Sequence, residues 1–138
     1  MDAASALADL TEISSQVEAA VVLDGSGAVV ASTLDDAGRS ARLARAAVDL
    51  LGAADKRFES GGRALTQLEA ALREGSVFVA REEGRSIVAT TSAEPTSGLV
   101  FYDLKTCLRS LAEPEPKPAR PKRRTTKVSE VPKEEGDA

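Results

Sequence analysis

The sequence predicts an α+β fold in which helices pack on a mainly antiparallel sheet. Two observations carry this prediction. Pairs of apolar, β-branched segments are joined by short turns that contain glycine, which is the signature of β-hairpins. Segments with apolar residues at every third or fourth position, as in amphipathic helices, lie before, between and after these pairs. The expected order is therefore helix, two strands, helix, two or three strands, helix.

The first three elements follow from local patterns. Residues 3–16 carry Ala3, Ala6, Leu7, Leu10 and Ile13 at helical spacing, which predicts an amphipathic helix. Residues 17–24 are rich in β-branched side chains, residues 24–27 are Asp-Gly-Ser-Gly, and residues 28–33 are apolar again. This pattern predicts a hairpin, because glycine supplies the positive φ angle that a tight turn needs.

The next segment, residues 37–59, is predicted to be a helix with two stripes. Asp35 and Asp36 precede it and can cap its N-terminus. The apolar stripe consists of Leu43, Ala47, Leu50, Ala54 and Phe58, and the stripe of small residues consists of Ala41, Ala44, Val48 and Gly52. Small side chains let a second helix approach closely, which indicates a partner helix. The alternative is that alanine is simply a good helix former in an Ala-rich chain.

Residues 64–73 are ambiguous. Their periodicity and their Ala, Glu and Leu content favour a helix, although alternation of Thr66, Leu68, Ala70 and Leu72 also fits a strand. Residues 77–81 and 87–91 are predicted strands joined by a turn at 82–85. A last helix is expected after Pro95, capped by Thr96 or Ser97. Its apolar stripe is Val100, Leu104, Cys107, Leu108 and Leu111.

Composition excludes several classes of active site. The 138 residues include no His and no Trp, one Cys and only 3% aromatic residues, with a formal net charge of −4. Without His there is no Ser/His or Cys/His pair, and a single Cys cannot form an internal disulfide or a thiolate metal cluster. We therefore expect a protein that is not an enzyme and that needs no cofactor, metal or small-molecule substrate.

The remaining candidate groups have simple explanations. Gly25 and Gly27 lie between two predicted strands, so they indicate a hairpin and not a phosphate loop. Cys107 lies on an apolar stripe, which favours a buried and inert thiol. The carboxylate pairs at 35–36 and 82–83 lie in predicted turns, where solvated charge is expected. Arg39, Arg42 and Arg45, with Asp49 one turn further on, form either a solvated face with intrahelical pairs or a cationic patch for an acidic partner.

Composition changes after Leu111, which divides the chain into a domain (residues 1–112) and a tail (residues 113–138). The tail holds five of the six prolines and almost no large apolar side chains, so it is expected to be disordered. The domain has a net charge of −5 and the tail +1. Residues 117–127 are basic. A solubilising linker is the favoured interpretation, with contact to nucleic acid, anionic lipid or an acidic protein through Lys122, Arg123 and Arg124 as the alternative. Thr125 or Thr126 is a candidate phosphorylation site.

The start of the chain shows no sign of export. Residues 1–8 contain no Lys or Arg, and no apolar run approaches the roughly 18 residues of a membrane span. We therefore expect a cytoplasmic protein.

Three strings, in this order, resemble the Roadblock/LC7 family. They are residues 20–32 (Ala-Val-Val-Leu-Asp-Gly-Ser-Gly-Ala-Val-Val-Ala-Ser), the Ala- and Leu-rich segment 37–59 before Gly61-Gly62, and residues 97–111 (Ser-Gly-Leu-Val-Phe-Tyr-Asp-Leu-Lys-Thr-Cys-Leu-Arg-Ser-Leu). The resemblance implies a profilin-like α-β-β-α-β-β-β-α sandwich with a five-stranded antiparallel sheet. The middle helix would cover one face and the two terminal helices the other, and residues 64–73 would form an edge strand, against their helical periodicity.

The resemblance also implies partners. In this family the edge strand and the middle helix typically form a homodimer, and pairing two exposed edges has a physical rationale. The interface would then include Ala41, Ala44, Val48, Gly52, Leu65, Gln67 and Glu69. Prokaryotic relatives commonly regulate a small Ras-like GTPase by acting on its nucleotide cycle, for which Arg42, Arg45 and Asp49 are the expected contacts. The alternatives are a scaffold or adaptor subunit, and a tether to nucleic acid or membrane through the tail.

Overall fold

The computed structural model describes residues 1–57 and 66–112. The chain forms three helices and five strands within these ranges. The elements are α1 (Ala3–Ile13), β1 (Val17–Leu23), β2 (Val29–Ser32), α2 (Ala37–Arg57), β3 (Gln67–Ala71), β4 (Gly75–Glu82), β5 (Arg85–Ser92) and α3 (Ser97–Ala112). The predicted tail, 113–138, lies outside the described residues, so the predicted domain boundary stays a prediction.

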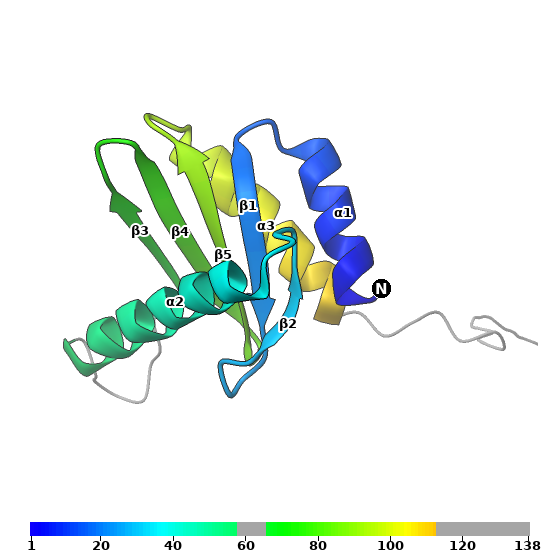
Figure 1. Cartoon of the computed structure of the whole chain (residues 1–138), viewed down its shortest axis with the longest axis horizontal. Coiled ribbons are helices and arrows are strands. Elements are labelled where there is room, and N and C mark those ends of the chain that lie inside the picture. The colour runs from blue at the N-terminus through cyan, green and yellow to red at the C-terminus, as the bar shows by residue number, and fades with distance from the viewer. Residues whose placement is uncertain (58–65, 113–138) are drawn as a thin grey trace, which may run out of the picture.

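The five strands form one sheet in the order β2-β1-β5-β4-β3, and every neighbouring pair is antiparallel. The predicted hairpins β1–β2 and β4–β5 are both present (Figure 1). Glu83 and Gly84 turn the second hairpin with φ angles of +53° and +80°, as a two-residue turn of the primed type requires. The α+β class and the five-stranded antiparallel sheet are thus confirmed.

The helices make layers on both faces of the sheet. α1 and α3 pack side by side on one face, and α2 crosses the other (Figure 1). Alternation along β1 sends Ala20 and Val22 to the α1–α3 side and Val21 and Leu23 to the α2 side. From Ala19 to Leu23 β1 is buried on both faces, and this part of its sequence is apolar without interruption.

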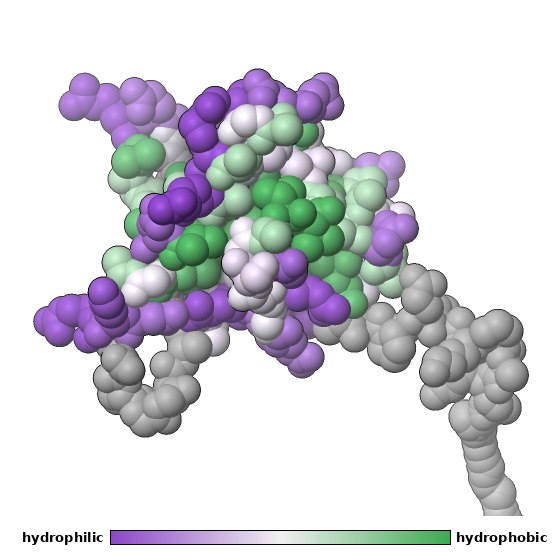
Figure 2. All heavy atoms as spheres, turned by 60° about the horizontal axis from the view of Figure 1, so that its bottom comes forward, coloured by the Kyte–Doolittle hydropathy of each residue, from purple (hydrophilic) through white to green (hydrophobic). Residues whose placement is uncertain are grey.

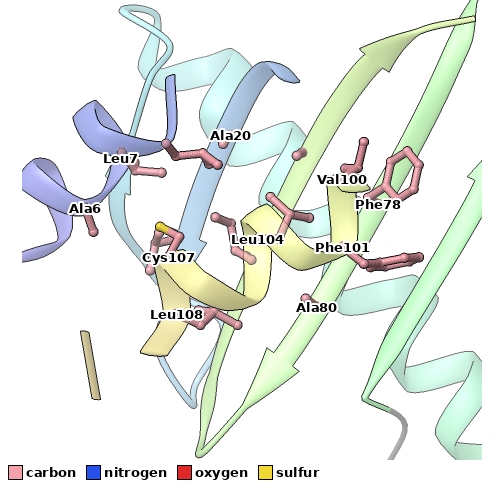
Figure 3. Close-up of a cluster of buried hydrophobic side chains, with 14 residues drawn as sticks. Ala6, Leu7, Ala20, Phe78, Ala80, Val100, Phe101, Leu104, Cys107 and Leu108 are labelled. Carbon is pink, nitrogen blue, oxygen red and sulfur yellow. The ribbon is translucent and has the colours of Figure 1, made fainter. Parts of the chain in front are cut away.

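The larger core cluster lies under α1 and α3. Leu104 and Leu108 of α3 point into it beside Cys107, as Figure 3 shows. Phe78 of β4 and Phe101 of α3 meet edge to face, with ring centroids 5.0 Å apart. The apolar stripe predicted for the last helix is therefore the stripe that faces the sheet.

The helix favoured by periodicity for residues 64–73 is wrong, since residues 67–71 form strand β3. Gln67 to Ala71 pair residue by residue with β4, and Leu68 packs against the cluster under α2. These contacts to distant residues outweigh the local helix propensity of Ala, Glu and Leu. The edge strand implied by the family resemblance is confirmed.

The stripe that α2 presents to the sheet also differs from the prediction. Its buried residues are Ser40, Ala44, Ala47 and Leu51. Of the predicted apolar stripe, Ala47 is buried, while Leu43, Leu50 and Ala54 are only half-buried; Phe58 lies outside the described residues. The helix rests on the sheet along a line between the two predicted stripes, because the short side chains of Ser40, Ala44 and Ala47 allow the closest approach to the strands.

Candidate protein interface

The outward surface of α2 carries the predicted contact residues Arg42, Arg45 and Asp49, and all three are exposed. The Arg45 Nε–H donates to Asp49 Oδ1 at 3.1 Å, one turn along the helix. These side chains are 78% and 65% exposed, so solvent screens the pair and leaves both available to a partner. Arg42 lines a shallow hollow of about 330 Å³ together with Arg39 and Leu43. This half of α2 is therefore a cationic, accessible surface.

The stripe of small residues on α2 is exposed at three of its four positions. Ala41 and Gly52 are exposed and Val48 is 40% exposed, whereas Ala44 is 4% exposed and packs on the sheet. Ala44 thus belongs to the core of this chain, and only the other three are available to a second helix. A Cβ placed on Gly52 would meet no atom of the described residues within 4 Å, so no contact among these residues requires glycine there.

A hollow of about 260 Å³ adjoins this stripe at the turn end of the sheet. Val48 and Gly52 of α2 face the two hairpin turns across it, where Gly25 and Gly84 contribute no side chains. Figure 2, which looks at the molecule from the lower side of Figure 1, shows apolar surface bordered by hydrophilic side chains. The flank of α2 that carries the small residues therefore borders a recess that a side chain can enter.

The edge strand β3 presents unpaired backbone groups. Thr66 and Leu72 bond to β4 at the two ends of the ladder, through Arg81 N–H to the Thr66 carbonyl and through Leu72 N–H to the Gly75 carbonyl. By the alternation of an antiparallel ladder, the backbone groups of Gln67, Glu69 and Ala71 point away from β4. Within the described residues β3 pairs with β4 alone. Gln67 and Glu69 are exposed, and Leu65 lies outside the described residues.

One side chain of this edge is already engaged within the chain. The Ser97 hydroxyl donates to Glu69 Oε2 at 2.9 Å, which ties the start of α3 to β3. Glu69 therefore offers a partner mainly its outward backbone groups. The Glu69 carboxylate is held on the α3 side.

The β1–β2 turn contains the Gly-Ser-Gly sequence considered above for phosphate binding. Asp24 Oδ1 accepts from the Ser26 N–H at 2.9 Å, from the Ser26 hydroxyl at 2.7 Å and from the Ala28 N–H at 3.1 Å. These hydrogen bonds, that from the Ser26 side chain above all, lower the pKa of Asp24 below its usual value. The amides of Ser26 and Ala28 thus already bond to a carboxylate, and the hairpin interpretation is confirmed.

The other candidate chemical groups serve the fold. Cys107 is 5% exposed, and burial raises the pKa of its thiol to about 11. Glu82 accepts from the Arg109 Nε–H at 3.2 Å, and Asp36 Oδ1 accepts from the Gly38 N–H at 2.7 Å, as predicted for a cap of α2. In the described part of the chain no three His, Cys, Asp or Glu side chains are grouped to hold a metal ion.

Two features were not predicted from the sequence. Arg81 of β4 forms a bidentate pair with Asp55 of α2, with N–O distances of 3.0 and 2.8 Å. Asp103 is buried in α3 beside α1. The residues of each feature are far apart in the sequence, and no spacing rule relates them. The tail residues Lys122, Arg123, Arg124, Thr125 and Thr126 lie outside the described residues, so their predicted contacts stay predictions.

Neither a family model nor a curated protein sequence matches the chain. Several solved structures do match the chain. A Roadblock/LC7 domain from Streptomyces avermitilis has a TM-score of 0.70 and 21% identity, covering 81% of this chain and 96% of that one.

The chain has the Roadblock/LC7 fold.

Two further structures share this fold. MglB in a tetrameric arrangement has a TM-score of 0.67 and 17% identity, covering 80% of this chain and 85% of that one. LokiProfilin1, in a complex with rabbit actin, has a TM-score of 0.54 and 10% identity, covering 78% and 91%. The Roadblock/LC7 and profilin-like architecture that the resemblance implied is therefore confirmed. Within the described residues, no helix is long and apolar enough to span a membrane.

Proposed function

We propose that this protein is a cytoplasmic, homodimeric regulator that binds a small Ras-like GTPase and modulates its nucleotide cycle. The observation that carries the proposal is the Roadblock/LC7 fold, combined with an exposed strand edge beside a cationic helix. The described residues offer no metal cluster, and the one Cys is buried and protonated at neutral pH. Such a regulator acts by repositioning the switch loops and catalytic groups of the GTPase.

Self-association is supported first by strand β3. Three residues, Gln67, Glu69 and Ala71, direct their backbone N–H and C=O groups outward. An edge of this kind pairs readily with another strand. Pairing with β3 of a second copy about a two-fold axis would join two five-stranded sheets into one of ten strands and would satisfy both edges equally.

The face that carries α2 also supports a second copy. α2 contacts β1, β2 and β5, and near β3 the side chains of Leu68 and Val77 are only half-buried. Val48 and Leu72 are 40% and 62% exposed. The α2 helix of a second copy would cover apolar surface that one helix leaves accessible, which would be favourable by about 25 cal/mol for each Å² removed from water.

The homodimer is tested by Glu69→Pro. Proline removes the outward N–H of Glu69 and leaves the hydrogen bonds between β3 and β4 intact, so we expect a folded monomer where the wild type is a dimer. Glu69→Ala is the matched control, since it removes the side chain and its bond to Ser97 but keeps the N–H. Light scattering measures the mass. A monomeric wild type rules out the homodimer.

The contribution of α2 to the dimer is tested by Val48→Glu. Val48 is 40% exposed in the single chain, so a carboxylate there is solvated in the monomer and buried in a helix–helix contact. We expect this variant to be monomeric with an unchanged circular dichroism spectrum. If Val48→Glu dimerises as the wild type does, the stripe of small residues is not the contact.

The GTPase surface is proposed to be the cationic side of α2. Arg42, Arg45 and Asp49 project from one side of the helix into solvent, whereas residues 1–112 as a whole are acidic, with a net charge of −5. Positive charge concentrated on one helix of an acidic domain orients an acidic partner as it approaches.

The test uses the Ras-like GTPase encoded nearest to this protein's gene, loaded with GDP or with a GTP analogue. We expect the wild type to bind one of these states and to change GTP turnover. Arg42→Glu with Arg45→Glu should weaken binding by at least about tenfold, whereas Lys105→Glu, a single charge reversal on α3, should leave it unchanged. Absence of binding in both nucleotide states, with unchanged turnover, rules out the regulator. Binding with unchanged turnover supports the adaptor instead.

A further inference from the structure

A groove of about 290 Å³ runs between α1 and α3, on the face of the sheet opposite α2. Its rim is apolar and exposed: Ile13 of α1 and Tyr102 of α3 are 68% and 65% exposed. Two carboxylates line it, Asp9 from α1 and Asp103 from α3. The groove thus combines negative charge with an exposed aliphatic and an exposed aromatic side chain.

Asp103 is the unusual residue of this groove. Its side chain lines the groove although the residue is only 8% exposed. No hydrogen bond or ion pair to Asp103 is formed within residues 1–57 and 66–112. The nearest cations along α3 do not form an ion pair with Asp103, since Arg109 donates to Glu82 and Lys105 does not line the groove. A cation entering the groove would form a charge-assisted hydrogen bond with the Asp103 carboxylate, which lines the groove and has no partner among the described residues.

We propose that the groove binds the basic segment 117–127 of the same chain, with a Lys or Arg side chain paired to Asp103 and Asp9. The segment contains six Lys or Arg residues and no Asp or Glu. The long aliphatic stems of these side chains suit Ile13, and their charged ends suit the ring face of Tyr102 as well as the carboxylates.

Chain length and direction allow this docking. α3 ends at Ala112, beside the start of α1, and Ser110 lines the near end of the groove (Figure 1). Asp103 lies nine residues back along α3, about 14 Å along the helix axis. Five extended residues span about 17 Å, so Lys117 is the first cation that can reach Asp103 by folding back.

Two properties of the segment reduce the cost of docking. Pro118 and Pro121 restrict the backbone, so less conformational entropy is lost on binding. The attachment of the segment to α3 places it near the groove at an effective concentration in the millimolar range, so that even weak pairing is populated. Docking would hold the tail on the α1–α3 face, away from α2 and the outward edge of β3.

The test places a spin label on the full-length chain through Ala119→Cys. The native Cys107 is buried with a raised pKa and should not take up the label at neutral pH. We expect the label to broaden the amide NMR signals of Ile13, Thr106 and Ser110, and to leave those of α2 unchanged. A label at the chain end, through Ala138→Cys, is the control and should broaden the groove signals much less.

The charge pairing is tested in the same labelled chain with Asp103→Asn and, separately, with Asp9→Asn, which replaces an exposed residue and leaves the core intact. Each should restore the groove signals substantially, as should 0.5 M salt. Broadening that is absent, that is spread over α2, or that survives both substitutions overturns the proposal. In a mixture of ¹⁵N-labelled chains without spin label and spin-labelled chains without ¹⁵N, broadening of the groove would show docking by another copy, which also overturns it.

Discussion

Burial decides the chemistry of Cys107. The thiol lies between Leu104 and Leu108 in the core under α3 (Figure 3) and is 5% exposed. Loss of hydration disfavours the thiolate, and the Asp9 carboxylate adds to this, so the pKa rises to about 11. The apolar stripe around Cys107 was sufficient to predict an inert thiol from the sequence.

We expect Cys107 to react slowly with Ellman's reagent. At pH 8 a pKa of about 11 leaves about a hundredfold less thiolate than the ordinary thiol pKa of 9.0, so native protein should react about a hundredfold more slowly than unfolded protein. The raised pKa also makes the free energy of unfolding depend on pH. The stability that the protonated Cys107 contributes to the folded state is complete below pH 9. It is lost as the pH rises from 9 toward 11, because the thiol of the unfolded chain ionises first. Cys107→Ala should lose less stability than the wild type between pH 9 and pH 11. Equal rates of reaction with Ellman's reagent for native and unfolded protein would contradict the buried thiol.

Gly75 is required by the closeness of two strands. A Cβ at this position would collide with the carbonyl oxygen of Thr91 on β5, and the backbone would have to move. We expect Gly75→Ala to lower the free energy of unfolding by about 2 kcal/mol or more in urea titrations. Gly98→Ala is the control, because a Cβ on Gly98 would meet no atom of the described part of the chain within 4 Å. This substitution should be neutral or stabilising. Equal effects of the two substitutions would show that the strand contact is not the cause.

At the level of the elements, α2 packs on the sheet through few side chains. Its buried residues are three small side chains and Leu51. The pair between Asp55 and Arg81 adds a polar connection from its second half to β4; the Arg81 side chain is 22% exposed and that of Asp55 38%. Partial shielding and bidentate geometry make this a stronger pair than an ordinary surface pair.

A double-mutant cycle on this pair measures its contribution. Asp55→Asn and Arg81→Ala should show a coupling free energy of about 1 kcal/mol in urea unfolding. The exposed pair Arg45–Asp49, treated in the same way, should show less than about 0.5 kcal/mol, because solvent screens it. Equal coupling in the two cycles would mean that burial adds nothing to the Asp55–Arg81 pair.

The elements differ in how far local patterns could predict them. The hairpins and the outer helices were predicted because their turns and apolar periods are set by neighbouring residues. Strand β3 could not be distinguished from a helix by period alone, since Leu68 and Ala70 fit both patterns, and its pairing with β4 decides the outcome. The outward position of Arg42, Arg45 and Asp49 follows from their place on the helix. The position of Asp103 in a groove against α1, without a partner among the described residues, depends on where α1 packs and has no signal in the sequence.

At the scale of the whole molecule, the sheet order predicts a gradient of local stability. β5 lies at the centre between β1 and β4, whereas β2 and β3 lie at the edges. Opening an edge strand breaks one ladder and opening a central strand breaks two, so local opening is least costly at the edges.

Amide hydrogen exchange should reveal this gradient and the homodimer together. We expect the slowest exchange in β1, β4 and β5. In the dimer, the outward amides of Gln67, Glu69 and Ala71 should also be protected, and dilution or Glu69→Pro should remove that protection at Gln67 and Ala71. Fast exchange of these amides at every protein concentration would mean that the β3 edge stays unpaired.

Residue type and spacing over a few positions were enough to predict the α+β class, the two hairpins and the Asp36 cap of α2, and they show that the chain has no His and no paired Cys. Tertiary structure alone decided that residues 67–71 are a strand, that α2 rests on Ser40, Ala44, Ala47 and Leu51, and that Asp103 lies in a groove against α1. These outcomes depend on contacts between residues distant in the chain. The free energies of these distant contacts exceed the small differences in local helix and strand propensity on which a sequence-based prediction relies.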